Sequence, residues 1–144
     1  METILFTKST ASVEETEAVG AEIARLAGDD GFIALFGDLG AGKTALTRGI
    51  ASVVTPGAFV CSPTYTIVNE YGEGKHRLFH FDMYRIEDED SLDSIGFWDY
   101  FGRGVIVTEW SENIPWALPE EYLKVVLEKT GDETRKITLF KVEK

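Results

Sequence analysis

The chain of 144 residues has the length of one compact domain, and its 44% hydrophobic and 27% charged residues exclude a disordered chain. Its formal charge of −11 disfavours direct, non-specific binding to nucleic acid, because such binding depends on lysine and arginine side chains that neutralise phosphates. The acidity either serves solubility alone or indicates that a protein partner holds any nucleic acid involved.

A helix is the first element that the sequence predicts. Ser12-Val-Glu-Glu15 has the spacing of a capping box, and Gly28 is suited to ending a helix. Between them, small and apolar residues recur at helical spacing, as on a helix face that packs against a core. These residues are Thr16, Val19, Gly20, Ile23, Leu26 and Ala27.

Strands and helices mix in the rest of the chain. A buried strand is predicted at residues 32–36, a helix at residues 43–54 and a short helix at residues 88–94. The other predicted strands are 66–71, 77–85, 104–108, 122–128 and 136–142, with hairpin turns at 72–75 and 130–134. The early strand–loop–helix unit predicts an α/β fold with a mixed, partly parallel sheet.

No segment of the sequence predicts a membrane span or a signal peptide. The longest apolar runs, residues 32–36 and 105–107, are too short to cross a bilayer, and METILFTKST at the N-terminus lacks a basic region followed by an apolar one. A single cysteine, Cys61, excludes an internal disulfide. Without repeats or linkers, we expect one domain over residues 1–144, located in the cytoplasm and not bound to a membrane.

The sequence GDLGAGKT, residues 37–44, fits the phosphate-binding motif G-x-x-x-x-G-K-[ST] between a predicted strand and a predicted helix. Glycines let backbone N–H groups approach phosphate oxygens, and the positive end of the helix dipole points at the same anion. Lys43 can reach the β- and γ-phosphates, and the Thr44 hydroxyl can bind Mg²⁺. The predicted nucleotide-binding residues of this segment are Gly37, Asp38, Leu39, Gly40, Ala41, Gly42, Lys43, Thr44 and Ala45.

Acidic residues occur on two further predicted strands. Glu109 follows an apolar strand, where a carboxylate can complete a magnesium site, although many ordinary strands also end in a solvated acid. On an earlier strand, the spacing places His80, Asp82 and Tyr84 on one face. We interpret His80 and Tyr84 as structural residues of a half-buried strand. Asp82 is either structural or an acid that orients water or supports the metal.

Five motifs, in this order, resemble the TsaE family, formerly YjeE, of small bacterial P-loop ATPases. They are GDLGAGKT (37–44), SPTYT (62–66), HFDMYR (80–85), DYF (99–101) and TEW (108–110). The resemblance covers about residues 32–110, and beyond it only length and pattern agree. Proteins of this family take part in making threonylcarbamoyladenosine at position 37 of tRNAs that read codons beginning with A.

The resemblance implies a P-loop NTPase fold, with helices flanking the sheet, and a site for ATP or ADP with Mg²⁺. Thr44 and Glu109 match the metal ligands of the family. Asp82 matches an acid that the family needs for hydrolysis. The catalytic residues implied in this way are Lys43, Asp82 and Glu109.

The resemblance also implies two further site residues and the partners of the protein. Thr64 matches a switch-like loop that senses the γ-phosphate, and Trp110 matches a tryptophan beside the active site. TsaE-like proteins act with the TsaB and TsaD proteins, of which TsaD transfers the threonylcarbamoyl group, and ATP hydrolysis resets that complex between turnovers. The tRNA would then contact this chain only indirectly, in agreement with the charge of −11.

No motif marks the pocket for the base, and the lack of an N-K-x-D signature favours ATP over GTP. Ser12 and Arg135 could flank the base, with Arg135 stacked on adenine. Equally, Ser12 could be an exposed helix cap and Arg135 a solvated charge. Arg85 has two interpretations as well, an arginine finger or a member of an ion pair.

Two other functions stay open at this point. A small-molecule kinase would need an acceptor pocket and an arginine-rich lid, and the acidic character of residues 87–94 counts against such a lid. A nucleotide-gated binding module would have negligible turnover. Phosphorylation of an acceptor would identify the kinase, and stimulation of turnover by partners would distinguish the ATPase from the binding module.

Overall fold

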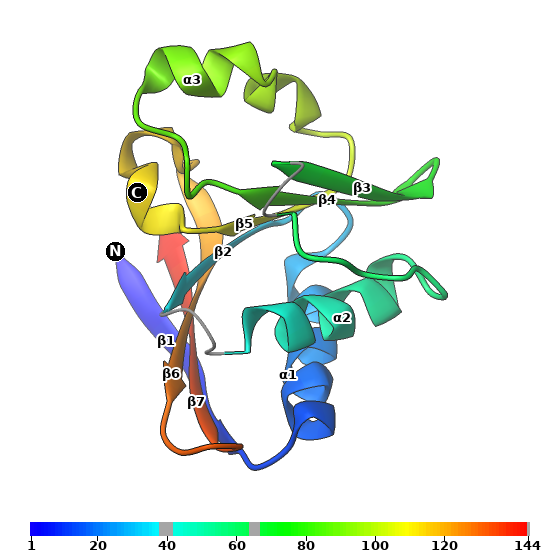
Figure 1. The fold of residues 1–144 in the computed structure, drawn as a ribbon, viewed down its shortest axis with the longest axis vertical. Helices are drawn as coiled ribbons and strands as arrows, with labels where there is room; N and C mark the ends of the chain where they lie inside the picture. The colour runs from blue at the N-terminus through cyan, green and yellow to red at the C-terminus, as the bar shows by residue number, and fades with distance from the viewer. Residues whose placement is uncertain (38–41, 64–66, 144) are drawn as a thin grey trace.

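A seven-stranded sheet forms the centre of the computed structural model, which describes residues 1–37, 42–63 and 67–143 (Figure 1). The strands are β1 (Glu2–Thr10), β2 (Phe32–Gly37), β3 (Val68–Glu73), β4 (His76–Asp82), β5 (Val105–Glu109), β6 (Glu121–Lys129) and β7 (Arg135–Glu143). The α-helices are α1 (Val13–Ala27), α2 (Lys43–Val54) and α3 (Glu89–Ser94), and the 3-10 helices are η1 (Phe97–Tyr100), η2 (Ser111–Asn113) and η3 (Pro115–Ala117).

The sheet is mixed, as the sequence predicts, with strand order β1-β7-β6-β2-β5-β4-β3. Its four central strands are parallel, because β2 pairs with β5 and β6, and β4 pairs with β5. The outer pairs β3–β4, β6–β7 and β1–β7 are antiparallel. The carboxyl ends of β2, β4, β5 and β6 therefore meet at one edge of the sheet, where ligands of open α/β sheets bind.

Each face of the sheet is covered by its own hydrophobic core. Helices α1 and α2 pack on one face, where Ile23 and Ile50 are fully buried, and α3 lies on the other side (Figure 1). The second core is aromatic, with the rings of Phe81 and Phe97 edge to face at 5.2 Å between centroids. The fold class predicted from the sequence, an α/β sheet flanked by helices, is confirmed.

Helix α1 begins and ends as predicted, but one residue of its predicted buried face is wrong. Ser12 Oγ accepts a hydrogen bond from the Glu15 amide at 3.1 Å, and Gly28 ends the helix with φ of +75°. Leu26 is 54% exposed, because it stands in the last turn of α1 and borders a surface cavity rather than the core. Ala24 is buried in that face instead.

The predicted strand over residues 77–85 is too long at its C-terminal end. Strand β4 stops at Asp82, because the Tyr84 amide donates to Asp82 Oδ1 at 2.9 Å and the chain turns away. Tyr84 is consequently 60% exposed and does not share the strand face of His80. Helix α2 has the predicted bounds, whereas β1 was not predicted at all.

In the part of the chain that the structure describes, no helix is long and apolar enough to cross a membrane.

Candidate nucleotide site

The phosphate-binding motif joins the carboxyl end of β2 to the N-terminus of α2. Gly37 has φ of +143°, and a Cβ there would collide with the carbonyl oxygen of Leu127 on the neighbouring strand, so only glycine fits. Gly42, with φ of +96°, stands at the start of α2 and supplies no side-chain cap to the first-turn amides. These amides are therefore available to an anion. Four predicted binding residues, Asp38, Leu39, Gly40 and Ala41, lie outside the described residues.

Lys43 is buried at this helix start, with 7% of its surface exposed. Its Nζ lies 4.7 Å from the ring centroid of Trp110, in cation–π geometry. Trp110 follows β5 directly in the left-handed region, with φ of +57°, and its ring lies 5.0 Å from that of Tyr84. The aromatic face thus holds the lysine charge at the site where a phosphate would compete for it.

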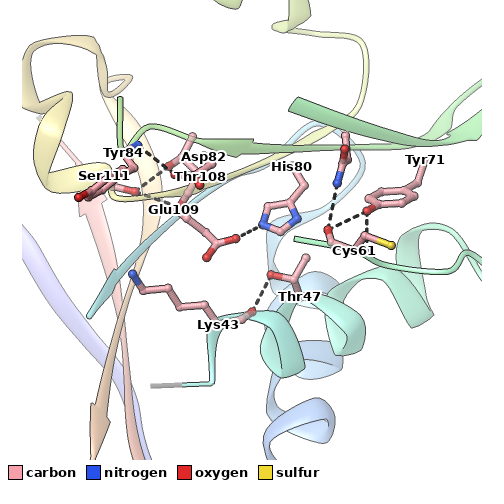
Figure 2. Close-up of polar contacts among 11 residues, drawn as sticks. Lys43, Thr47, Cys61, Tyr71, His80, Asp82, Tyr84, Thr108, Glu109 and Ser111 are labelled. Atoms are coloured by element: carbon pink, nitrogen blue, oxygen red, sulfur yellow. Dashed lines mark hydrogen bonds and ion pairs between the residues drawn. The ribbon is translucent and has the colours of Figure 1, made fainter. Parts of the chain in front are cut away.

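Two carboxylates stand at the ends of adjacent parallel strands, on the side of the sheet that α2 covers (Figure 2). Asp82 and Glu109 are register partners of β4 and β5. Asp82 is 9% exposed, and one of its oxygens accepts the Tyr84 amide. The Glu109 side chain is 12% exposed, and its Oε2 lies 2.5 Å from His80 Nε2. Of the three predicted catalytic residues, the structure therefore pairs Asp82 with Glu109, and the Glu109 carboxylate points to the side of Lys43 (Figure 2).

The chemistry of these side chains fits Mg²⁺. Thr44 offers a hydroxyl in the first turn of α2, and Asp82 and Glu109 offer carboxylates, all hard oxygen donors. Among residues 1–37, 42–63 and 67–143, no group of three or more His, Cys, Asp or Glu side chains could hold a metal ion. Such a small donor set matches Mg²⁺ that keeps waters and binds phosphate oxygens together with one or two carboxylates.

A cavity of about 390 Å³ lies on the other side of the P-loop helix, and it contains both residues predicted to flank the base. Ser12, Arg135, Gly42 and Ala45 are among the residues that line it. Arg135 Nη1 donates to the carbonyl oxygens of Gly131, Asp132 and Thr134, within the β6–β7 turn. The cavity joins the start of α1 to that turn and adjoins the phosphate motif.

The family model described as "Threonylcarbamoyl adenosine biosynthesis protein TsaE" matches residues 10–137. The chain belongs to the TsaE family. It is 42% identical over 130 residues to "tRNA threonylcarbamoyladenosine biosynthesis protein TsaE" of Bacillus subtilis, covering 90% of this chain and 81% of that protein. The Haemophilus influenzae protein of the same name is 42% identical over 106 residues, or 73% of this chain and 66% of that protein. The fold agrees with a crystal structure of Bacillus subtilis YdiB at a TM-score of 0.79 and 35% identity, covering 99% of this chain and 88% of that one.

Two further predicted residues of this TsaE-family chain are Thr64 and Arg85. Thr64, the candidate γ-phosphate sensor, lies outside the described residues. Arg85 follows β4 and is exposed, and it makes no ion pair with any other residue that the structure describes.

Sequence reasoning gave His80 no place in the site of this TsaE-family protein. The structure places its ring against Glu109, on the face of the sheet that α2 covers. The signal lay in the spacing, since His80 stands two residues before Asp82 on the strand next to that of Glu109. The spacing alone could not identify the contact between His80 and Glu109, because the sequence does not show that β4 and β5 are neighbours.

Proposed function

We propose that this TsaE-family protein binds and hydrolyses ATP with Mg²⁺, and that it does so in the biosynthesis of threonylcarbamoyladenosine in tRNA. One observation carries the proposal: Asp82 and Glu109 end neighbouring parallel strands, and the Glu109 carboxylate points to the side of Lys43, at the start of α2. A buried lysine after a glycine-rich turn, with acids at neighbouring strand ends, is the arrangement of P-loop NTPases.

The phosphates are held by the chain between Gly37 and Ala45. The first-turn amides of α2 donate hydrogen bonds to phosphate oxygens, and the Lys43 ammonium leaves the Trp110 ring to reach the β- and γ-phosphates. Exchange of a cation–π contact for a charge-assisted hydrogen bond favours the bound state. Adenine enters the cavity between Ser12 and Arg135, where the guanidinium can stack on it.

Thr44 and Glu109 would hold Mg²⁺, and the ion would supply positive charge to the phosphate oxygens. Asp82 orients the attacking water, directly or through a water of the metal. Among the contacts of the described residues, only its Oδ1 takes part in a hydrogen bond, with the Tyr84 amide, so the other oxygen can accept a hydrogen bond from water. The fixed carboxylate needs no rearrangement when the substrate binds.

As the partners of the chain in this pathway we propose TsaB and TsaD. With a formal charge of −11, the chain is poorly suited to hold tRNA itself, so the partners bind the tRNA and TsaD transfers the threonylcarbamoyl group. ATP hydrolysis resets the complex between turnovers. The loop at residues 62–66, which contains Thr64, reports the γ-phosphate to the partner surface.

The test is ATP turnover with Mg²⁺, measured for the chain alone and with purified TsaB and TsaD. We expect low turnover alone and stimulation by the partners. Equal turnover in both conditions, together with a phosphorylated small molecule in an acceptor screen, would contradict the proposal in favour of a kinase. Equal turnover without an acceptor product would leave a nucleotide-gated binding module.

A further inference from the structure

His80 is a fully buried polar side chain, and its only described partner is a residue of the nucleotide site. The residue is 0% exposed, and Nε2 lies 2.5 Å from Glu109 Oε2. Its strand neighbours Leu78 and Phe79 are also fully buried. A buried side chain that contacts a single polar group is well placed to control the orientation of that group.

The chemistry of the two groups fixes the direction of the hydrogen bond. A carboxylate only accepts, so Nε2 carries the proton and donates it to Glu109. Nδ1 makes no hydrogen bond with any residue that the structure describes. The ring thus presents a single donor, and it presents that donor to the candidate metal ligand.

We infer that His80 is a positioning residue for magnesium: it holds one oxygen of Glu109 and so presents the other to the ion. The inference rests on the proposed function, because it requires that Glu109 binds Mg²⁺ with the nucleotide. In Figure 2 the second carboxylate oxygen of Glu109 lies on the side of Lys43, where the phosphates are expected. Partners that orient metal ligands in this way change metal affinity by roughly 10- to 100-fold when they are removed.

A purely structural role for His80 makes the opposite predictions. A structural hydrogen bond would contribute to folding, and its loss would lower the stability of the chain without changing the need for Mg²⁺. Replacement of a buried polar side chain by an apolar one of similar size can be nearly neutral for stability, although here it also leaves the Glu109 carboxylate without its donor. Stability and magnesium dependence therefore separate the two roles.

The experiment measures the binding of a fluorescent ADP analogue to the full chain, first in EDTA and then at increasing MgCl₂. For His80→Leu we expect unchanged binding of the analogue in EDTA. The MgCl₂ midpoint, the concentration at which half of the magnesium-dependent change in analogue binding has occurred, should be roughly 10- to 100-fold higher than in the wild type. His80→Gln, whose side-chain amide can place an N–H near the position of Nε2, should restore most of the wild-type midpoint. Should His80→Leu fail to fold, His80→Asn takes its place, because the shorter amide does not reach Glu109.

Leu78→Ala is the matched control. It truncates a fully buried side chain of the same strand and lowers the unfolding temperature, while Glu109 and its contact with His80 are left in place. Its MgCl₂ midpoint, measured below its unfolding temperature, should equal that of the wild type. An equal shift of the midpoint in Leu78→Ala and His80→Leu would overturn the inference in favour of a general loss of stability.

A double-variant cycle tests whether His80 acts through Glu109. Glu109→Gln alone and Glu109→Gln combined with His80→Leu should have the same MgCl₂ midpoint, because His80 has nothing left to position. Additive shifts, or a wild-type midpoint in His80→Leu, would overturn the inference while leaving the proposed ATPase intact. A wild-type chain that binds the analogue equally with and without Mg²⁺ would overturn both.

Discussion

The two sides of the P-loop helix are built in different ways. On one side, Asp82 and Glu109 end neighbouring central strands, are nearly buried, and are held by a backbone amide and by His80. On the other side, the cavity near Arg135 is lined by the start of α1 and by an exposed turn between β6 and β7. Groups fixed on strand ends suit chemistry, which requires exact placement, whereas exposed groups on a turn suit recognition of a base.

The largest effect is expected for Lys43→Ala, which removes the positive charge proposed to bind the β- and γ-phosphates. Hydrogen bonds to charged groups contribute about 1.5–3 kcal/mol each, so the affinity for ATP should fall by roughly 100-fold or more. Equilibrium binding of a fluorescent ATP analogue measures this loss, with Lys8→Ala, remote on β1, as the matched lysine control. If Lys43→Ala bound the analogue with wild-type affinity, the P-loop would not be part of the nucleotide site.

Asp82→Asn should act on turnover alone. It keeps the size of the side chain and the oxygen that accepts the Tyr84 amide, but it loses the negative charge that orients water. Turnover in the assembled complex should fall by about 10²- to 10⁴-fold, with ATP affinity within a few-fold of the wild type. Normal hydrolysis by the Asp82→Asn complex would show that Asp82 is structural.

A smaller effect, on affinity rather than turnover, is expected on the cavity side for Arg135→Ala. Loss of a cation–π contact of about 0.5–2 kcal/mol should weaken ATP binding by roughly 2- to 30-fold. Arg135→Lys keeps the charge but loses the planar group, so it should restore little. Equal weakening of ATP and inorganic triphosphate binding would place Arg135 on the phosphates rather than the base.

Ser12→Ala should have the smallest effect on the ligand and a measurable effect on the fold. The hydroxyl caps α1 by accepting the Glu15 amide, and loss of such a cap costs about 1 kcal/mol. Thermal unfolding should show this loss, while Ser12→Gly should lose only a few tenths of a kcal/mol. A large drop in ATP affinity with unchanged stability would instead show that the Ser12 hydroxyl itself bonds to the nucleotide.

The sequence predicted the phosphate motif and the acids of the candidate site better than their surroundings. The motif around Lys43 and the acid Glu109 were predicted from local patterns of strand, glycine and charge, whereas the choice of Asp82 as a site residue depended on the resemblance to the TsaE family. The contact of His80 with Glu109 was missed because it depends on which strands are neighbours, and this is decided by tertiary packing.

The periphery of the fold was predicted less well for a related reason. Strand β1 lies at the sheet edge with most of its residues exposed, so it carries little of the alternation that marks a half-buried strand. The end of β4 at Asp82 depends on a side-chain hydrogen bond that no periodicity contains. Leu26 was predicted to be buried because helical spacing does not show where the core ends.

Helices α1 and α2 pack so closely that glycine is required on each of them. A Cβ at Gly20 would collide with the carbonyl oxygen of Leu46, and one at Gly49 with that of Glu17, so the two backbones lie in direct contact at two points. Ser12 precedes α1 and Lys43 begins α2, and this interlock therefore sets the span between the cavity and the phosphate motif. The packing of the two helices therefore determines how long a ligand must be to reach both the cavity and the phosphate motif.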